Sequence, residues 1–196
     1  MLRELKPIRQ SMMNNNRKKI VVSCIATIFL VLLYCLIFSF SEQDGETSGG
    51  LSQKVSKKCV EIVDEVTNRN WTKQMKESLA EYFEHPIRKL AHFSEYAVMG
   101  ILVFIIWCPW LGLPEKMNPE AKNKGLFAFW QRNRIKIIVM IWVFLSAVFD
   151  EIHQTFTPGR DGNFLDVLLD TTGGCFGLVV CLLCAKLTKR LRRKKD

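Results

Sequence analysis

The sequence predicts an all-α polytopic membrane protein with four transmembrane helices, both termini in the cytoplasm, and an extracytoplasmic helical segment between helices 1 and 2. Two features of its 196 residues predict this class: 48% are hydrophobic, and a formal net charge of +9 is concentrated between long apolar runs. A soluble domain mixes charges over its surface, whereas a membrane protein confines them to the ends of its spans. The same segregation argues against a nucleic-acid partner, because such a basic patch lies on a polar domain.

The first span is expected at 20–38, after a basic cytoplasmic tail at 1–19. The run contains 19 residues and no charge, close to the roughly 20 residues that cross a hydrocarbon core. A cleaved signal peptide is the competing interpretation, because Ser39-Phe40-Ser41 has the spacing of a cleavage site. The apolar core of a signal peptide is usually shorter than this run. We therefore expect an uncleaved anchor helix.

The segment 39–89 is expected to lie outside the cell. Residues 39–50 are rich in Ser, Gly and acidic residues, which is typical of a flexible linker. Apolar residues then recur at helical spacing in 51–66 and again in 71–83, before Pro86 interrupts the pattern. These two amphipathic helices are expected to lie on the bilayer or to cap the bundle, and a dedicated partner site is the alternative.

The second and third spans are expected at 90–113 and 135–156. Pro109 and two flanking tryptophans are typical of a helix that ends at the headgroup level. The apolar part of the third span, 135–149, has only 15 residues. At 1.5 Å per residue it is about 22 Å long, against a hydrocarbon core of about 30 Å. The third helix must therefore continue into the acidic and polar residues that follow.

The fourth span is expected at 165–187 and carries two acidic residues, Asp166 and Asp170, near its start. Gly173 and Gly177 form a small-xxx-small pair, which lets a neighbouring helix approach closely. Because the same stripe bears the aspartates, we expect this pair to pack within the monomer rather than in a homodimer.

The distribution of Lys and Arg predicts the orientation. The 1–19 tail, the connection from Pro114 to Lys136 and the C-terminal end from Lys186 onward carry 19 basic and four acidic residues. The 39–89 segment carries eight basic and nine acidic residues. Because basic residues are retained in the cytoplasm, both termini are expected there, and 157–164 becomes a short extracytoplasmic loop.

Polar residues converge on the outer end of this bundle along three helical stripes and one connector. They are Arg88, Lys89, His92, Glu95 and Tyr96 in the second helix, Asp150, Glu151, His153 and Gln154 in the third, Asp166 and Asp170 in the fourth, and Arg160 and Asp161 in the connector. Charges are costly next to lipid, so we expect these groups to face the bundle interior or a wet recess and to pair with one another. An ion-paired latch, a ligand site and a catalytic site all remain compatible with this pattern.

The order and spacing of these residues resemble the VanZ family. The matching segments are 88–96 (RKLAHFSEY), 150–162 (DEIHQTFTPGRDG) and 166–173 (DVLLDTTG), and the resemblance covers a VanZ-like domain at 86–187. It implies a small multi-pass protein of the bacterial cell membrane with a role in the cell envelope. The founding member is associated with resistance to the glycopeptide antibiotic teicoplanin, and the stretch after the first span is similar to members from Gram-positive bacteria.

The resemblance carries the polar motif of the family onto ten positions of this chain. These ligand-binding candidates are Arg88, Lys89, His92, Glu95, Tyr96, Asp150, Glu151, Gln154, Arg160 and Asp166. Asp170 departs from the family pattern, in which asparagine is more common. An additional acid there makes an anionic ligand less favourable unless it is protonated or paired.

The function that the resemblance favours is a non-enzymatic one, in which the outer recess binds an amphiphilic envelope component or a lipid-anchored antibiotic. Arg88, Lys89 and Arg160 are expected to meet its phosphate or carboxylate groups. The expected partners are membrane lipids and a cell-wall precursor or lipoglycopeptide, with no nucleic acid, no cofactor and no resident metal.

Two other functions stay open. A membrane-embedded hydrolase or lipid-modifying enzyme would use His92, Glu95, Asp150, Glu151 and His153 around a divalent metal. The sequence contains neither an HExxH nor a GxSxG motif, which disfavours this reading. A scaffold for envelope assembly would use the polar residues only as a latch and would bind its partner through the outer helices.

Overall fold

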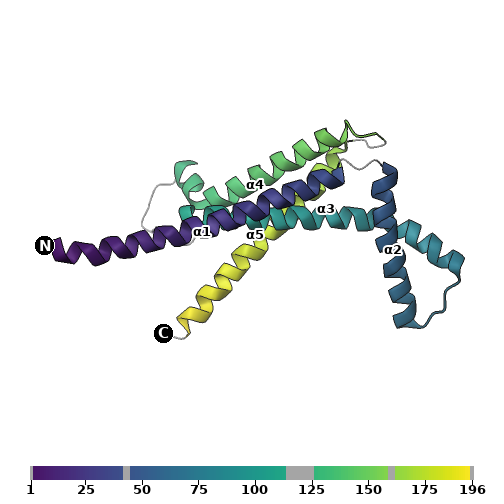
Figure 1. Cartoon of the computed structure of the whole chain (residues 1–196), viewed down its shortest axis with the longest axis horizontal. Helices are drawn as coiled ribbons and strands as arrows, with labels where there is room; N and C mark the ends of the chain where they lie inside the picture. The colour runs from purple at the N-terminus through teal and green to yellow at the C-terminus, as the bar shows by residue number, and fades with distance from the viewer. Residues whose placement is uncertain (1, 42–44, 114–125, 159–161, 195–196) are drawn as a thin grey trace.

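The computed structural model of the chain describes residues 2–41, 45–113, 126–158 and 162–194. These residues form five helices and no strand, which confirms the all-α prediction (Figure 1). The helices are α1 (Leu2–Ser41), α2 (Gly45–Thr67), α3 (Lys73–Leu111), α4 (Leu126–Gln154) and α5 (Phe164–Arg193).

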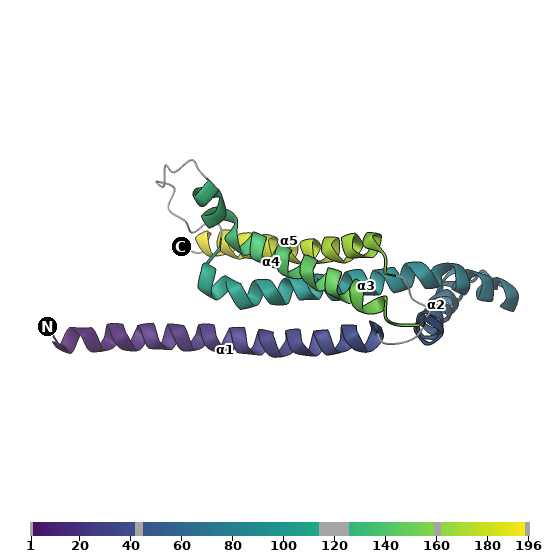
Figure 2. The ribbon, with the colours of Figure 1, turned by 90° about the horizontal axis from the view of Figure 1, so that it is seen from above.

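Three of the five helices are long and apolar enough to cross a membrane. They are α1 over Met13–Ser41, α3 over its full length, and α5 over its full length. The fourth helix, α4, is not one of these three among the described residues. Both chain termini lie at one end of the bundle and α2 lies at the other (Figures 1 and 2).

The central element of the molecule is α3, which contacts all four other helices. Its buried side chains include Tyr96, Met99 and Val103, each at most 1% exposed. They pack against Val139 and Val143 of α4, which are fully buried in the same core cluster. Many other apolar side chains of α1, α4 and α5 are exposed, as is normal for helices whose outer surface meets lipid.

Glycine residues bring α3 and α5 into backbone contact. A Cβ atom at Gly173 would collide with the carbonyl oxygen of Phe93, and one at Gly177 would collide with the carbonyl oxygen of Ala97. This confirms that the small-xxx-small pair packs within the monomer. Only glycine leaves room for such an approach, and it places the first turns of α5 directly beside the polar stripe of α3.

We predict that Gly177→Ala destabilises the protein by roughly 1–3 kcal/mol, because the added methyl group must push the α3 backbone away. Thermal unfolding in detergent measures this loss. Gly50→Ala is the matched control, since a Cβ at Gly50 meets no atom within 4 Å and alanine is the better helix former. Equal unfolding temperatures for wild type and Gly177→Ala would contradict the close packing.

The outer segment differs from the prediction in two respects. The first amphipathic helix exists as α2, but it begins at Gly45, so the linker expected at 39–50 is wrong except for 42–44, which lie outside the described residues. The second is not a separate helix, because α3 continues through Pro86 into the membrane-spanning part. Proline removes one backbone hydrogen bond, and packing of the preceding turns against α2 keeps the helix continuous.

Polar contacts hold α2 and the start of α3 together as a hairpin. The Lys76 ammonium lies 2.6 Å from the Asp64 carboxylate, and the Trp71 amide donates to Asp64 at 3.0 Å. The hydroxyl of Ser56, which is buried, donates to the carbonyl of Ala80 at 2.6 Å. Hydrogen bonding to Lys76 holds the pKa of Asp64 below its ordinary value, and the same contact raises the pKa of Lys76.

The lowered pKa of Asp64 predicts the direction of the pH dependence of the hairpin. A carboxyl group whose pKa is lowered in the folded state stabilises the fold at pH values above its unfolded-state pKa of about 4. This contribution is lost as the pH falls through the folded-state pKa. We expect the NMR shift of the Trp71 amide to titrate with a midpoint below about 4. Lys76→Met should move that midpoint upward, and an unchanged midpoint would contradict the role of the ion pair.

Two further boundaries differ from the predicted ones. Pro109 does not end its helix: α3 runs to Leu111, and Gly112, with a positive φ of 74°, forms the C-cap. In the loop expected at 114–134, residues 126–134 are already helical, because α4 begins at Leu126 rather than at 135, while 114–125 lie outside the described residues. The Arg134 guanidinium donates to the carbonyl of Leu111 at 2.5 Å and so ties the early part of α4 to the end of α3.

Candidate functional site

Apart from Ser52, Ser56 and Asp64 in α2, the buried polar residues among those described gather at one end of the bundle, where α1 and α4 stop, α5 begins and α3 enters from the hairpin. We call this region the polar end. Its most buried part comprises five residues from four helices, which we call the carboxylate cluster: Ser41, His92, Asp150, Gln154 and Asp170. Asp150 and Asp170 are each 1% exposed and Ser41 is fully buried.

Asp150 is held in place by two side chains. The hydroxyl of Ser41 donates to its Oδ1 at 2.6 Å, and Gln154, one turn later in α4, donates through Nε2 to its Oδ2 at 3.1 Å. Thr157 also donates its hydroxyl to the carbonyl of Ser41 at 3.2 Å. The end of α1 is thereby joined both to α4 and to the chain that leaves it.

Asp170 and His92 complete the carboxylate cluster from α5 and α3. One potential ligand atom each from His92, Asp150 and Asp170 lie within 4.8 Å of one another. The Oδ1 atom of Asp170 is buried and has no hydrogen-bond partner among the described residues. A buried carboxylate oxygen without a partner is costly, so this atom marks a position where a proton or a cation is needed.

A second group of contacts, which is more exposed to solvent, lies next to the carboxylate cluster. Lys89 of α3 forms an ion pair with Asp166 of α5, and their side chains remain 26% and 25% exposed. Glu151 accepts a hydrogen bond from the Asn163 amide at 2.7 Å, which closes the loop between α4 and α5. Asn163 itself caps α5 by accepting from the Leu165 amide at 3.0 Å.

Of the remaining predicted site residues, some lie at the polar end and others do not. Glu95 lies 3.8 Å from the Nδ1 atom of His92, and Arg88 is half-buried on α3. Tyr96 is directed away from the polar end, because its hydroxyl donates to the carbonyl of Ser146 in α4 at 3.3 Å. Arg160 and Asp161 lie outside the described residues.

The residue set expected for an enzyme is brought together only in part. His92 and Asp150 lie in the carboxylate cluster, but His153 packs edge-on against Phe38 of α1, with ring centroids 5.6 Å apart. Asp170 is the third member of the metal-ligand geometry instead. Ser41 was missed altogether, because a serine that ends an apolar run carries no local signal for a hydrogen bond to a residue 109 positions later.

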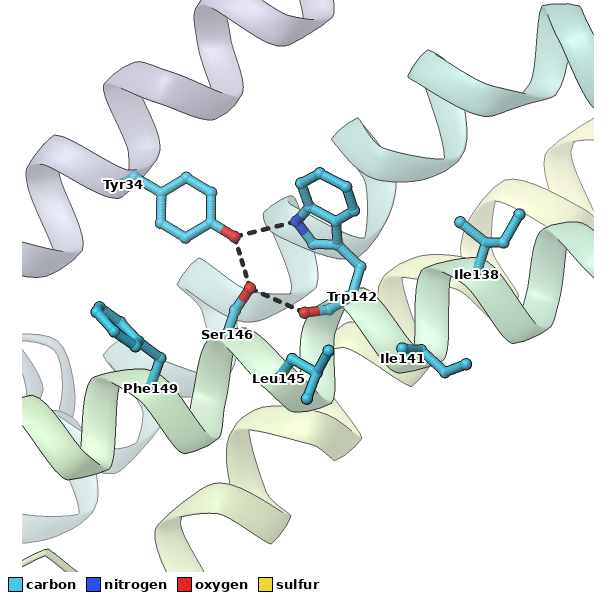
Figure 3. Close-up of a pocket in the computed structure, with 7 residues that line it drawn as sticks. All are labelled: Tyr34, Ile138, Ile141, Trp142, Leu145, Ser146 and Phe149. Carbon is cyan, nitrogen blue, oxygen red and sulfur yellow. Dashed lines mark hydrogen bonds between the residues drawn. The ribbon is translucent and has the colours of Figure 1, made fainter.

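A groove between α1 and α4 adjoins the polar end (Figure 3). Its volume is about 410 Å³, and its lining is Tyr34, Ile138, Ile141, Trp142, Leu145, Ser146 and Phe149. The hydroxyl of Tyr34 lies 2.5 Å from that of Ser146 and accepts from the Trp142 indole at 3.0 Å. The polar atoms of the lining therefore satisfy one another, which leaves an apolar surface open to the side of the bundle.

Phe38 connects the groove with the polar end. Its ring lies 5.9 Å from that of Phe149, which lines the groove, and it also contacts His153. Phe149 is followed directly by Asp150 of the carboxylate cluster. The apolar groove and the buried carboxylate cluster are thus neighbours along α1 and α4.

These features define a polytopic helical membrane protein with a polar site at one end of its bundle. A model of the VanZ/LLP1 family matches residues 26–185, so the chain belongs to this family. The predicted membership of this family is thereby confirmed. No curated protein matches the chain, and no solved structure matches it.

Proposed function

We propose that this VanZ-family protein binds an amphiphilic component of the bacterial cell envelope, or a lipid-anchored glycopeptide such as teicoplanin, at an outer-leaflet recess formed by the polar end. The observation that carries the proposal is the position of the groove. Its apolar lining ends at Phe149, one residue before Asp150, so an acyl chain in the groove brings its polar head to the buried polar residues. Amphiphile sites have this combination of apolar walls and a few polar groups.

The proposed topology is four spans, at 20–38, 90–113, 135–156 and 165–187, with both termini in the cytoplasm of a Gram-positive cell. Two observations support it: both termini lie at one end of the bundle (Figure 2), and the basic residues are concentrated at that end and in the 114–134 segment. In this arrangement α4 is the fourth span, and the hairpin of α2 and α3 lies outside the cell beside the polar end.

In this proposal the cationic side chains bind the anionic head of the ligand. Lys89 keeps about a quarter of its side chain exposed even in its ion pair with Asp166, and Arg88 beside it is half-buried. Both therefore remain accessible to phosphate or carboxylate groups, which accept charge-assisted hydrogen bonds. The carboxylate cluster is more deeply buried, and its hydrogen bonds to Asp150 hold the helix ends in place.

Exchanging the charges of Lys89 and Asp166 distinguishes two roles of Lys89. It either binds the ligand or only joins two helices through its ion pair. We predict that Lys89→Asp weakens ligand binding roughly tenfold or more, since a hydrogen bond to a charged group contributes about 1.5–3 kcal/mol. The double variant Lys89→Asp with Asp166→Lys re-forms the ion pair and should recover thermal stability but not teicoplanin protection.

The measurement is teicoplanin and vancomycin susceptibility of a sensitive Gram-positive host at matched membrane levels of each variant. Recovery of protection in the double variant would show that the ion pair is only a latch. No protection by the wild type would contradict the glycopeptide role and favour an envelope component as the ligand.

The groove gives a second prediction. Leu145→Trp places an indole where the acyl chain is proposed to lie, and displacing two or three methylene groups costs roughly 2 kcal/mol of binding. Protection should fall while the thermal stability remains unchanged. Leu183→Trp is the matched control, because Leu183 is 54% exposed on α5 and does not line the groove. Full protection by Leu145→Trp would contradict an acyl chain in the groove.

A further inference from the structure

We propose that His92, Asp150 and Asp170 bind one divalent transition-metal cation, Zn²⁺ or Mn²⁺, at the centre of the carboxylate cluster. This site does not depend on the proposed function, because it is argued from the cluster alone and is tested by metal binding. The three residues come from α3, α4 and α5, so a bound cation would join the three helices that form the polar end.

The geometry is close to that of a metal site. The potential ligand atoms of the three residues lie within 4.8 Å of one another. Ligands of a four-coordinate zinc ion at about 2.0–2.1 Å are roughly 3.4 Å apart. Small side-chain rotations close this difference of about 1.4 Å, and the contact of α5 with α3 at Gly173 keeps the two helices close together.

The unpartnered oxygen of Asp170 is the independent observation that points to a ligand. Asp170 is 1% exposed, and its Oδ1 atom has no hydrogen-bond donor among the described residues. Neither Asp150 nor Asp170 forms an ion pair with a Lys or Arg in the part of the chain that the structure describes, since Lys89 is paired with Asp166. Two buried carboxylates this close together need positive charge between them.

The surroundings of Asp150 match those of a metal-binding carboxylate. Ser41 and Gln154 donate to its two oxygens, which fixes the orientation of the carboxylate and leaves further lone pairs free for a cation. Such outer hydrogen bonds are a regular feature of metal sites. The glutamine also reaches the Ser41 hydroxyl at 3.5 Å, so the three side chains form one connected unit.

The donor types select the class of cation. One imidazole nitrogen with carboxylate oxygens suits Zn²⁺ or Mn²⁺, whereas Ca²⁺ and Mg²⁺ prefer oxygen donors only. Three protein ligands leave at least one coordination position for water or for an oxygen of a ligand. Glu95 lies 3.8 Å from the Nδ1 atom of His92, close to the proposed site.

The test is direct metal binding by the full-length protein in lipid nanodiscs after removal of metals with EDTA. Titration with Mn²⁺, followed by the EPR signal of the free ion, should give one equivalent bound to the wild type. Asp170→Asn should bind at least about tenfold more weakly, because it loses a charged ligand but keeps its shape. Asp64→Asn is the matched control, since it removes one carboxylate from the hairpin and should bind as the wild type does.

X-ray absorption of the Zn²⁺-loaded wild type gives a second measurement that needs no variant. It should show nitrogen and oxygen neighbours at about 2.0–2.2 Å and no sulfur. Absence of stoichiometric binding by the wild type would overturn the site and leave protons as the neutralising charge. Equal affinity in Asp170→Asn, or sulfur neighbours from any of the seven cysteines, would overturn it as well.

Discussion

The close approach of α3 and α5 is the constraint on which the rest of the polar end depends. Their backbones touch at Gly173 and Gly177, where a single methyl group would collide with a carbonyl oxygen. Asp170 lies one turn before this contact, and His92 lies beside it on α3. Larger residues at the glycines would separate the helices and with them the two side chains. The glycines thus position the site without taking part in its chemistry.

The polar end contains two electrostatic environments. Around Lys89 and Asp166 the side chains are partly exposed, so water screens their charges. In the carboxylate cluster Asp150 and Asp170 are almost fully buried, so their charge must be removed by a proton or balanced by a neighbour or a bound cation. In the proposed function, ligand exchange belongs to the partly exposed Lys89 and Asp166, and the buried carboxylates keep a fixed structural role.

The first helix contributes more than an anchor. Its last described residue, Ser41, donates to Asp150, and its Tyr34 forms one wall of the groove. A hydrogen-bonded row of Tyr34, Ser146 and Trp142 keeps that wall free of unsatisfied polar atoms. A change in the position of α1 would therefore alter the groove and the carboxylate cluster together, which couples the apolar and polar parts of the proposed site.

The sequence by itself determined the all-helical class, the apolar runs of α1, α3 and α5, and the polar stripes, because helical periodicity and the cost of charge in lipid are local properties of the chain. It also indicated the glycine contact from its small-xxx-small spacing. Only the tertiary structure decided that α3 passes through Pro86, that Tyr96 turns to Ser146, and that Ser41 joins the cluster. These outcomes depend on contacts between helices far apart in the sequence, for which no local pattern exists.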